Sequence, residues 1–203
     1  LAGLICGTLF GSLNGFVVTK MKVPPFIATF GASGIAQSVA NTLSNKRTIS
    51  WESAPNNRLV DLLGSNVLTV IFGPQPSQIL SISVLLLITL LVIACVLLVF
   101  KKTTLGSNIY ALGANEETAR LSGINTVRWK VGVYMLSGFL AAVAGMVVMI
   151  RTNSLQPTVG DGLEFQAVVA AVLGGNSMKG GKGSIPGALF GALTLRSEER
   201  RVG

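Results

Sequence analysis

The chain has no histidine, only two cysteines and few charged residues. Without histidine it lacks the commonest general base and the commonest metal ligand. Cys6 and Cys95 lie inside apolar runs, where an isolated thiol behaves as a small hydrophobic side chain. We therefore predict no disulfide, no metal site and no cofactor.

Charged side chains make up only 12% of the 203 residues, against about a quarter in soluble domains. Half of the residues are hydrophobic, 24 are glycine, and the mean hydropathy is +0.64. Small residues let helices approach closely in a membrane. This composition predicts an all-α protein: a polytopic transmembrane helical bundle, surrounded by membrane lipid.

The net charge of +8 does not indicate a nucleic-acid partner. The basic residues lie in short loops between apolar runs and form no continuous stripe. They are better explained by the excess of Lys and Arg in the cytoplasmic loops of membrane proteins.

The apolar runs predict about five crossing segments and one incomplete segment. The clearest is residues 79–100, an uncharged run that reaches roughly 33 Å as a helix. Residues 26–43 are interrupted by polar side chains, so we place them in the bundle interior. Residues 44–78 are predicted to be an external loop with a short surface element at 67–72. The other segments are 1–19, 131–150, a short or broken helix at 161–175, and an incomplete helix from 185.

Small residues recur every three or four positions in two of these segments. The first has glycine at positions 3, 7, 11 and 15, and the second has small residues at 138, 141, 142 and 145. Each set lies on one helix face, so both predict close packing against a neighbouring helix.

Basic residues predict the orientation of the chain. Nine fall in loops assigned to the inside, against four outside, which places residues 106–130 in the cytoplasm. The inside set is Lys20, Lys22, Lys101, Lys102, Arg120, Arg128, Lys130, Lys179 and Lys182, and the outside set is Lys46, Arg47, Arg58 and Arg151.

Residues 106–130 form the longest polar interruption between two apolar runs, and they predict one short helix at 116–122. Asn115 is a good N-cap, and Glu116 and Glu117 favour the positive helix N-terminus. Glu116 and Arg120 have the spacing of a stabilising pair. Gly123 suits the left-handed conformation that ends a helix. Packing through Ala119, Leu121 and Ile124 is expected to hold this helix. Both a docking element and a simple connector fit these features.

Polar side chains in the apolar segments are candidates for a solute pathway. Asn14 is polar within the first segment, and Thr29, Ser33 and Gln37 share one face of the second. Hydrogen bonding between helices explains the same residues equally well.

Two motifs do not support catalysis. The stretch GGNSMKGGKGS is similar to a phosphate-binding loop, but Gly183 follows Lys182 where Ser or Thr is required. We interpret it as a tight cytoplasmic turn. Glu116 and Glu117 are adjacent and do not share a helix face.

Three stretches resemble the permease subunits of bacterial ABC sugar importers of the ribose, xylose and galactose type. They are NGFVVTKMKVPPFIATFG, ALGANEETARLSGIN and LQPTVGDGLEFQAVVAAVLGGNSMKGGKGSIPGALFGAL, and the resemblance covers residues 1–195. It implies a multi-pass protein of the bacterial inner membrane with a cytoplasmic coupling loop. It also implies a second permease copy, a cytoplasmic ATPase subunit that contacts the region 119–123, and an external sugar-binding protein. Phe165-Gln166 departs from the family, which has Leu-Asp after Glu164, so Glu164 enters the pathway set without its neighbouring carboxylate.

Both ends of the chain are predicted to be truncated. The apolar run at residues 185–195 is too short to cross a core that needs about 20 residues, and RSEERRVG replaces it abruptly. Residues 1–195 are then a partial permease domain, and residues 196–203 a non-native tail; a genuine amphipathic tail is the alternative.

Three other functions remain open from the sequence. A branched-chain amino-acid permease has a similar architecture. An integral-membrane enzyme needs a cluster of reactive side chains at membrane depth, whereas the acids here are scattered in loops. The third is a lipid-embedded structural protein with no solute route.

Overall fold

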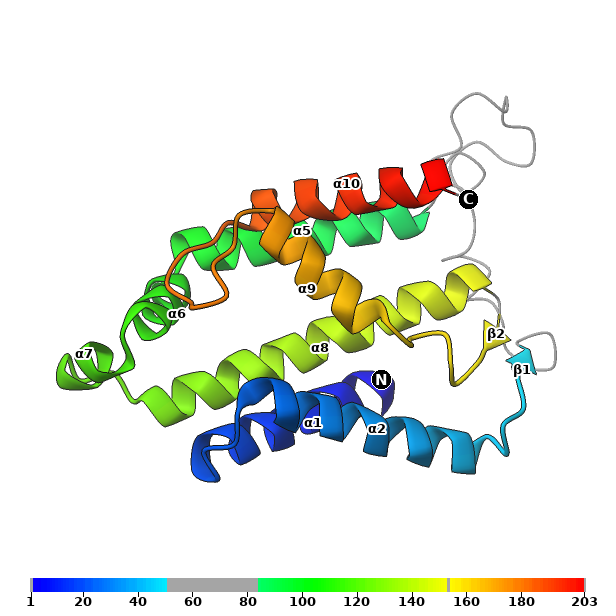
Figure 1. The fold of residues 1–203 in the computed structure, drawn as a ribbon, viewed down its shortest axis with the longest axis horizontal. Coiled ribbons are helices and arrows are strands. Elements are labelled where there is room, and N and C mark those ends of the chain that lie inside the picture. The colour runs from blue at the N-terminus through cyan, green and yellow to red at the C-terminus, as the bar shows by residue number, and fades with distance from the viewer. Residues whose placement is uncertain (1, 51–83, 153, 203) are drawn as a thin grey trace. The chain divides into compact units, whose positions relative to one another are not determined.

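In the computed structural model, the described part of the chain comprises residues 2–50, 84–152 and 154–202. These residues form helices almost throughout, which confirms the all-α fold class (Figure 1). The chain divides into two units, residues 1–96 with 134–159 and residues 97–133 with 160–203. The helices are α1 (Ala2–Lys20), α2 (Pro25–Leu43), α5 (Val84–Lys102), α6 (Thr104–Ala114), α7 (Glu116–Leu121), α8 (Thr126–Thr152), α9 (Leu163–Leu173) and α10 (Ile185–Val202).

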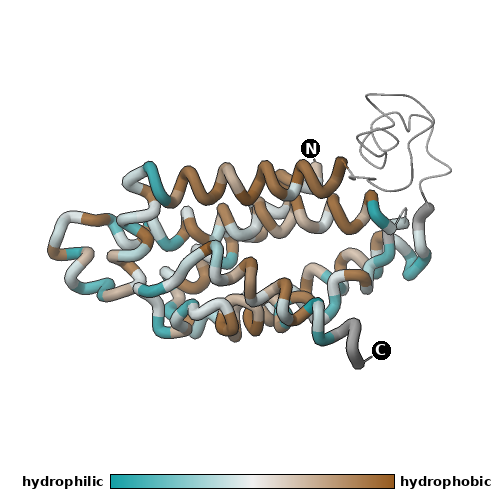
Figure 2. The backbone as a smooth tube through the Cα atoms, turned by 90° about the horizontal axis from the view of Figure 1, so that it is seen from above, coloured by the Kyte–Doolittle hydropathy of each residue, from teal (hydrophilic) through white to brown (hydrophobic). Residues whose placement is uncertain are grey.

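Three of the described helices are long and apolar enough to cross a membrane: α1, α5 and α8. This is fewer than the predicted five. The α2 helix has the length, at 19 residues, but is less apolar, and α9 has only 11 residues. Apolar residues dominate the helices in Figure 2, and polar residues gather at their ends and in the connecting loops. The chain therefore has the composition of a multi-pass membrane protein, with one short helix as predicted.

In the first unit, α1 packs against α8 through its glycines. A Cβ atom on Gly7 would lie 2.6 Å from the Ala142 Cβ and 2.7 Å from the Gly138 carbonyl oxygen. A Cβ atom on Gly138 would in turn lie 3.0 Å from the Gly11 Cα. Only glycine permits such an approach of two backbones, which confirms the small-residue packing expected of both helices. Gly145 is an exception, because no atom lies within 4 Å of its Cβ position.

The α2 helix is not in the interior of the described chain, and this prediction is wrong. It has no buried residue, and its apolar side chains, such as Phe26, Ile35 and Leu43, are exposed. One side of α2 contacts α1. The remaining side chains of α2 are exposed or half-buried, although polar residues interrupt its apolar run. The composition of α2 indicates that it does not face lipid on all sides, but it does not predict how many helices pack against it.

A short antiparallel pair of strands, β1 (Ile49–Ser50) and β2 (Ser154–Leu155), joins the ends of α2 and α8 in the first unit. Ile49 pairs with Leu155, and Ser50 pairs with Ser154. The sequence did not predict this contact, because a two-residue ladder has no detectable alternation. The surface element expected at residues 67–72, and Arg58, lie outside the described residues.

In the second unit, α9 and α10 form a closely packed helical hairpin. Ala170 and Gly191 are buried, and a Cβ atom on Gly191 would lie 2.8 Å from the Gly174 nitrogen. Gly187 and Gly191 are four residues apart, the spacing that brings small residues onto one helix face. The α10 helix continues beyond the apolar run into the polar tail and ends at Val202.

Residues 106–130 are more structured than predicted. The α6 helix occupies their first part, α7 follows after a single residue, and α8 already begins at Thr126. The prediction for this polar stretch was a single short helix at residues 116–122. In the structure, Gly106 at the start of α6 is buried against the Phe100 backbone.

Candidate functional site

The α7 helix is capped at its start as the sequence predicted. The Asn115 side-chain oxygen accepts hydrogen bonds from the backbone nitrogens of Glu117 (3.0 Å) and Thr118 (3.1 Å). Glu116 and Glu117 lie in the first turn, near the positive end of the helix dipole. These contacts satisfy two backbone donors that a six-residue helix otherwise leaves free.

The end of α7 is closed by a Schellman motif around Gly123. The Gly123 nitrogen donates to the Arg120 carbonyl (3.0 Å), and the Ile124 nitrogen donates to the Ala119 carbonyl (3.1 Å). Gly123 has φ +82°, in the left-handed region that favours glycine. The predicted C-terminal stop is therefore confirmed.

Glu116 has a different ionic partner from the predicted one. Its carboxylate accepts from the Lys130 ammonium at 2.5 Å, rather than from Arg120 four residues along. This contact ties the first turn of α7 to the first turns of α8, across 14 residues of sequence. Arg120 lies exposed in the last turn of α7.

The apolar residues of α7 divide between packing and exposure. Ala119 is buried at 4% exposure and Ile124 is half-buried, as predicted, but Leu121 is 82% exposed, so its predicted packing role is wrong. Ala119 and Leu121 are two residues apart, about 200° around the helix axis, so they cannot both face inward. The result is a helix capped at both ends that presents an exposed leucine to its surroundings.

The glycine-rich loop 176–184 supports α6 in the same unit. The Tyr110 hydroxyl donates to the Gly183 carbonyl (3.0 Å), and a Cβ atom on Gly113 would lie 2.7 Å from the Gly181 nitrogen. The loop's own backbone donors are used internally: the nitrogens of Ser177 and Gly180 donate to carbonyls of the same loop. The loop is thus a tight turn, as predicted, and its amides do not form a phosphate cradle.

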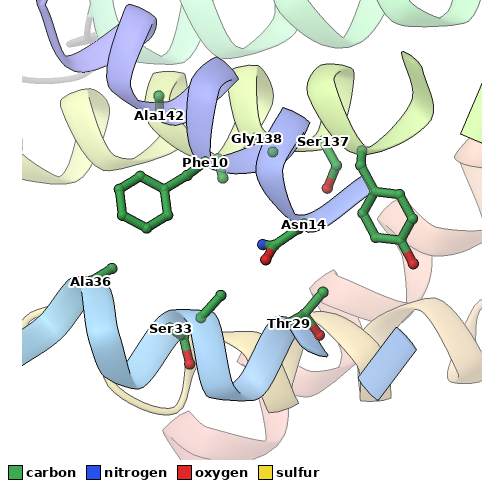
Figure 3. Close-up of a pocket in the computed structure, with 13 residues that line it drawn as sticks. Phe10, Asn14, Thr29, Ser33, Ala36, Ser137, Gly138 and Ala142 are labelled. Carbon is green, nitrogen blue, oxygen red and sulfur yellow. The ribbon is translucent and has the colours of Figure 1, made fainter. Parts of the chain in front are cut away.

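A cavity of about 370 Å³ lies in the first unit, between α1, α2 and α8 (Figure 3). All of its lining side chains are uncharged. Asn14 and Thr29, two of the predicted pathway residues, are both among them. The lining residues are Gly7, Phe10, Gly11, Asn14, Thr29, Ala32, Ser33, Ala36, Tyr134, Ser137, Gly138, Ala141 and Ala142.

The two other predicted pathway residues do not line this cavity. Gln37 lies one turn beyond Ser33 on α2, half-buried, and Glu164 is exposed in the first turn of α9 in the second unit. A smaller cavity of about 280 Å³ in that second unit is lined by α9 and α10, including Gln166 and Arg196. Glu164 is not part of it either.

The contribution of α8 to the larger cavity was not among the predictions from the sequence. Tyr134, Ser137 and Ala141 are spaced three and four residues apart, so they share one helix face. That spacing was the available signal. The same face carries the small residues that predict helix packing, so spacing alone does not distinguish a cavity lining from a packing face.

Comparison with known proteins finds one matching family. Residues 1–197 match the family described as branched-chain amino acid transport system / permease component. No solved structure matches the chain.

Curated relatives carry the names of sugar permeases. The chain is 39% identical over 192 residues to the ribose import permease protein of Haemophilus influenzae, which covers 95% of this chain and 56% of the relative. It is 34% identical to the fructose import permease protein of Rhizobium meliloti, over 96% of the chain and 52% of the relative. It is 36% identical to the L-arabinose transport system permease protein of Escherichia coli K12, over 99% of the chain and 57% of the relative.

The chain thus spans a little over half the length of these relatives, and the match extends across nearly all of its own residues. The family match, the identities and the membrane-length helices agree with one another. The chain belongs to the branched-chain amino acid transport system / permease component family of membrane transport proteins.

Proposed function

We propose that this chain is part of the permease subunit of an ATP-driven importer that moves a small sugar into the cytoplasm. The observation that carries the proposal is the set of relatives: three proteins named for three different monosaccharides each match at least 95% of the chain. The membrane is the bacterial inner membrane, in which the chain crosses several times.

The uncharged cavity supports a sugar over a branched-chain amino acid. An amino acid carries a carboxylate and an ammonium group, and burying either without a charged or dipolar partner is costly. A monosaccharide has only hydroxyl groups to satisfy. The cavity offers amide and hydroxyl groups from Asn14, Ser137 and Tyr134 and no formally charged side chain.

The α7 helix supports docking to a cytoplasmic ATPase subunit. Residues 115–123 form a capped helix held by Lys130, with Leu121 exposed at its end. An exposed leucine on a capped helix would remove apolar surface from water if it entered a hydrophobic pocket on the partner. The predicted contact set is Asn115, Glu116, Glu117, Ala119, Arg120, Leu121 and Gly123; of these, Ala119 acts from within by holding the helix in place.

Transport then proceeds by alternating access. ATP binding by the partner displaces α7, and the helix bundle rocks so that the cavity opens to one side at a time. An external sugar-binding protein delivers the solute, and a second copy of the permease completes the transporter. The ATPase supplies the free energy, and the permease itself performs no chemistry.

The docking proposal is tested by substitution of α7 in the complete transporter. Leu121→Asp places a charge where a hydrophobic anchor is proposed. Gly123→Pro removes the Gly123 hydrogen bond and cannot adopt φ +82°, and Arg120→Glu reverses a charge at the exposed end. Each is expected to abolish labelled-ribose uptake while membrane insertion stays intact. Leu43→Asp, at a leucine that is 80% exposed on α2 at the predicted outer side, is the matched control.

Binding of the purified ATPase subunit to each variant separates docking from folding. Loss of ATPase binding with Leu121→Asp, and its retention with Leu43→Asp, supports the assignment. Full uptake by the three α7 variants contradicts it. Uptake of labelled leucine in place of ribose by the unsubstituted transporter contradicts the sugar assignment itself.

A further inference from the structure

The cavity between α1, α2 and α8 has the size of a small-ligand site. Its volume of about 370 Å³ falls in the range of about 300–1,000 Å³ that is usual for such sites. Each of the three helices contributes an apolar side chain to the lining, Phe10 from α1, Ala36 from α2 and Ala142 from α8, and polar side chains lie between them (Figure 3). A few polar groups in an otherwise apolar pocket are typical of sites that orient a ligand.

The polar groups on α2 are already used by their own helix. The Thr29 hydroxyl donates to the Pro25 carbonyl (2.9 Å), and the Ser33 hydroxyl donates to the Phe30 carbonyl (2.7 Å). Figure 3 shows the Ser33 hydroxyl directed away from the cavity. These two residues therefore offer the cavity little donor capacity.

The polar groups that α1 and α8 contribute to the cavity are not used in this way. Among the residues that the structure describes, the Asn14 amide and the hydroxyls of Tyr134 and Ser137 have no hydrogen-bond partner. Asn14 and Tyr134 are half-buried, and Figure 3 shows the Asn14 amide pointing from α1 toward α2. An amide at such a depth is expected to find a partner.

We propose that Asn14, Tyr134 and Ser137 are the residues of this chain that bind and select the transported solute, a neutral polyhydroxyl compound of monosaccharide size. The inference rests on the proposed function and extends it to named contacts. It replaces Thr29 and Gln37 of the predicted pathway set with Tyr134 and Ser137 on α8.

The chemistry of the three groups fits a sugar. The Asn14 amide has two donor hydrogens and an acceptor oxygen, and each hydroxyl donates one hydrogen and accepts others. A sugar hydroxyl also donates and accepts, so in each contact either the protein or the sugar can be the hydrogen-bond donor. Phe10 supplies an apolar surface for the C–H face of the sugar ring, which needs no hydrogen-bond partner. No charged side chain lines the cavity, so binding of a neutral sugar there buries no charge.

The test uses the complete transporter in proteoliposomes, with labelled ribose, fructose and L-arabinose as probes. The variants are Asn14→Ala, Tyr134→Phe and Ser137→Ala. Ser38→Ala is the control, because the Ser38 hydroxyl donates to the Gly34 carbonyl on α2 and does not line the cavity. Sugar moved per ATP hydrolysed is measured for each probe, together with the melting temperature of the complex.

Each of the three variants is expected to lower the sugar moved per ATP about 3- to 10-fold, the effect of one lost hydrogen bond, and to change the ratio between ribose and L-arabinose. The melting temperature and the ATPase activity stay as in Ser38→Ala. If the variants equal the control in the sugar moved per ATP and in the ratio of ribose to L-arabinose, the inference is overturned. A melting temperature that falls together with transport also overturns it, since these groups then bond to other helices. If the unsubstituted transporter moves none of the three sugars, the proposed function is refuted instead.

Discussion

Gly7 and Gly138 are positions where one methyl group decides whether two helices meet. At both, the nearest atoms to a Cβ position belong to the backbone or Cβ of the facing helix, which cannot rotate away as a long side chain does. In a membrane, such close backbone approach replaces the hydrophobic driving force that lipid does not provide.

We predict that Gly138→Ala destabilises the first unit by about 1–3 kcal/mol, the usual cost of overpacking. The added methyl group would lie 3.0 Å from the Gly11 Cα and still nearer to the Gly7 backbone. Thermal unfolding of the complete permease in detergent measures the effect. Gly145→Ala is the matched control, because its Cβ position has no atom within 4 Å. Equal melting temperatures for the two variants would contradict the packing described for α1 and α8.

At the scale of elements, the second unit is organised by two close contacts, one between consecutive helices and one between segments that are distant in sequence. The α9–α10 hairpin is closed by small residues, and its connecting loop rests on α6. The α6 helix leads directly into α7. The loop 176–184 therefore supports the position of the element that we propose contacts the ATPase.

Gly181→Ala is expected to loosen this loop. Gly181 has φ +75°, and a Cβ atom there would lie 2.7 Å from the Ala114 Cα, so the variant meets both backbone strain and a steric clash. Faster hydrogen exchange in α6 and in residues 176–184 is the expected result, with reduced sugar uptake. Gly160→Ala, where no atom lies within 4 Å, serves as control. Unchanged exchange in Gly181→Ala would show that the loop does not support α6.

At the scale of the whole molecule, the contacts within each unit bring together segments that the basic residues assign to the same side of the membrane. In the first unit, the β1–β2 pair brings the segment after Arg47 next to the segment after Arg151, both assigned to the outside. In the second unit, the loop with Lys179 and Lys182 rests on α6, and Lys130 holds α7. These groupings support the proposed orientation, with α7 in the cytoplasm.

Labelling of single cysteines tests that orientation. Cys6 and Cys95 are both exposed, so each is first replaced by serine. Met21→Cys and Met178→Cys, at exposed positions beside predicted inside lysines, are expected to react with a membrane-impermeant thiol reagent only from the cytoplasmic side. Thr48→Cys, exposed next to Arg47, should react only from outside. The opposite pattern would place α7 outside the cell and exclude docking to a cytoplasmic ATPase.

The sequence by itself determined the features that depend on neighbouring residues. Apolar runs gave the spans α1, α5 and α8, because hydropathy and length are local quantities. The cap at Asn115 and the stop at Gly123 followed from side-chain and backbone chemistry within nine residues. The family resemblance also follows from sequence alone and agrees with the relatives found.

Only the tertiary structure decided which residues meet across distance. It paired Glu116 with Lys130 instead of Arg120, left Leu121 exposed, and packed Gly106 at the start of α6 against the Phe100 backbone. It also separated Asn14, Tyr134 and Ser137, whose polar groups remain available to the cavity, from Thr29 and Ser33, whose hydroxyls bond to their own helix. A helical pattern places a residue on a face, but the identity of the atom opposite depends on how the helices pack.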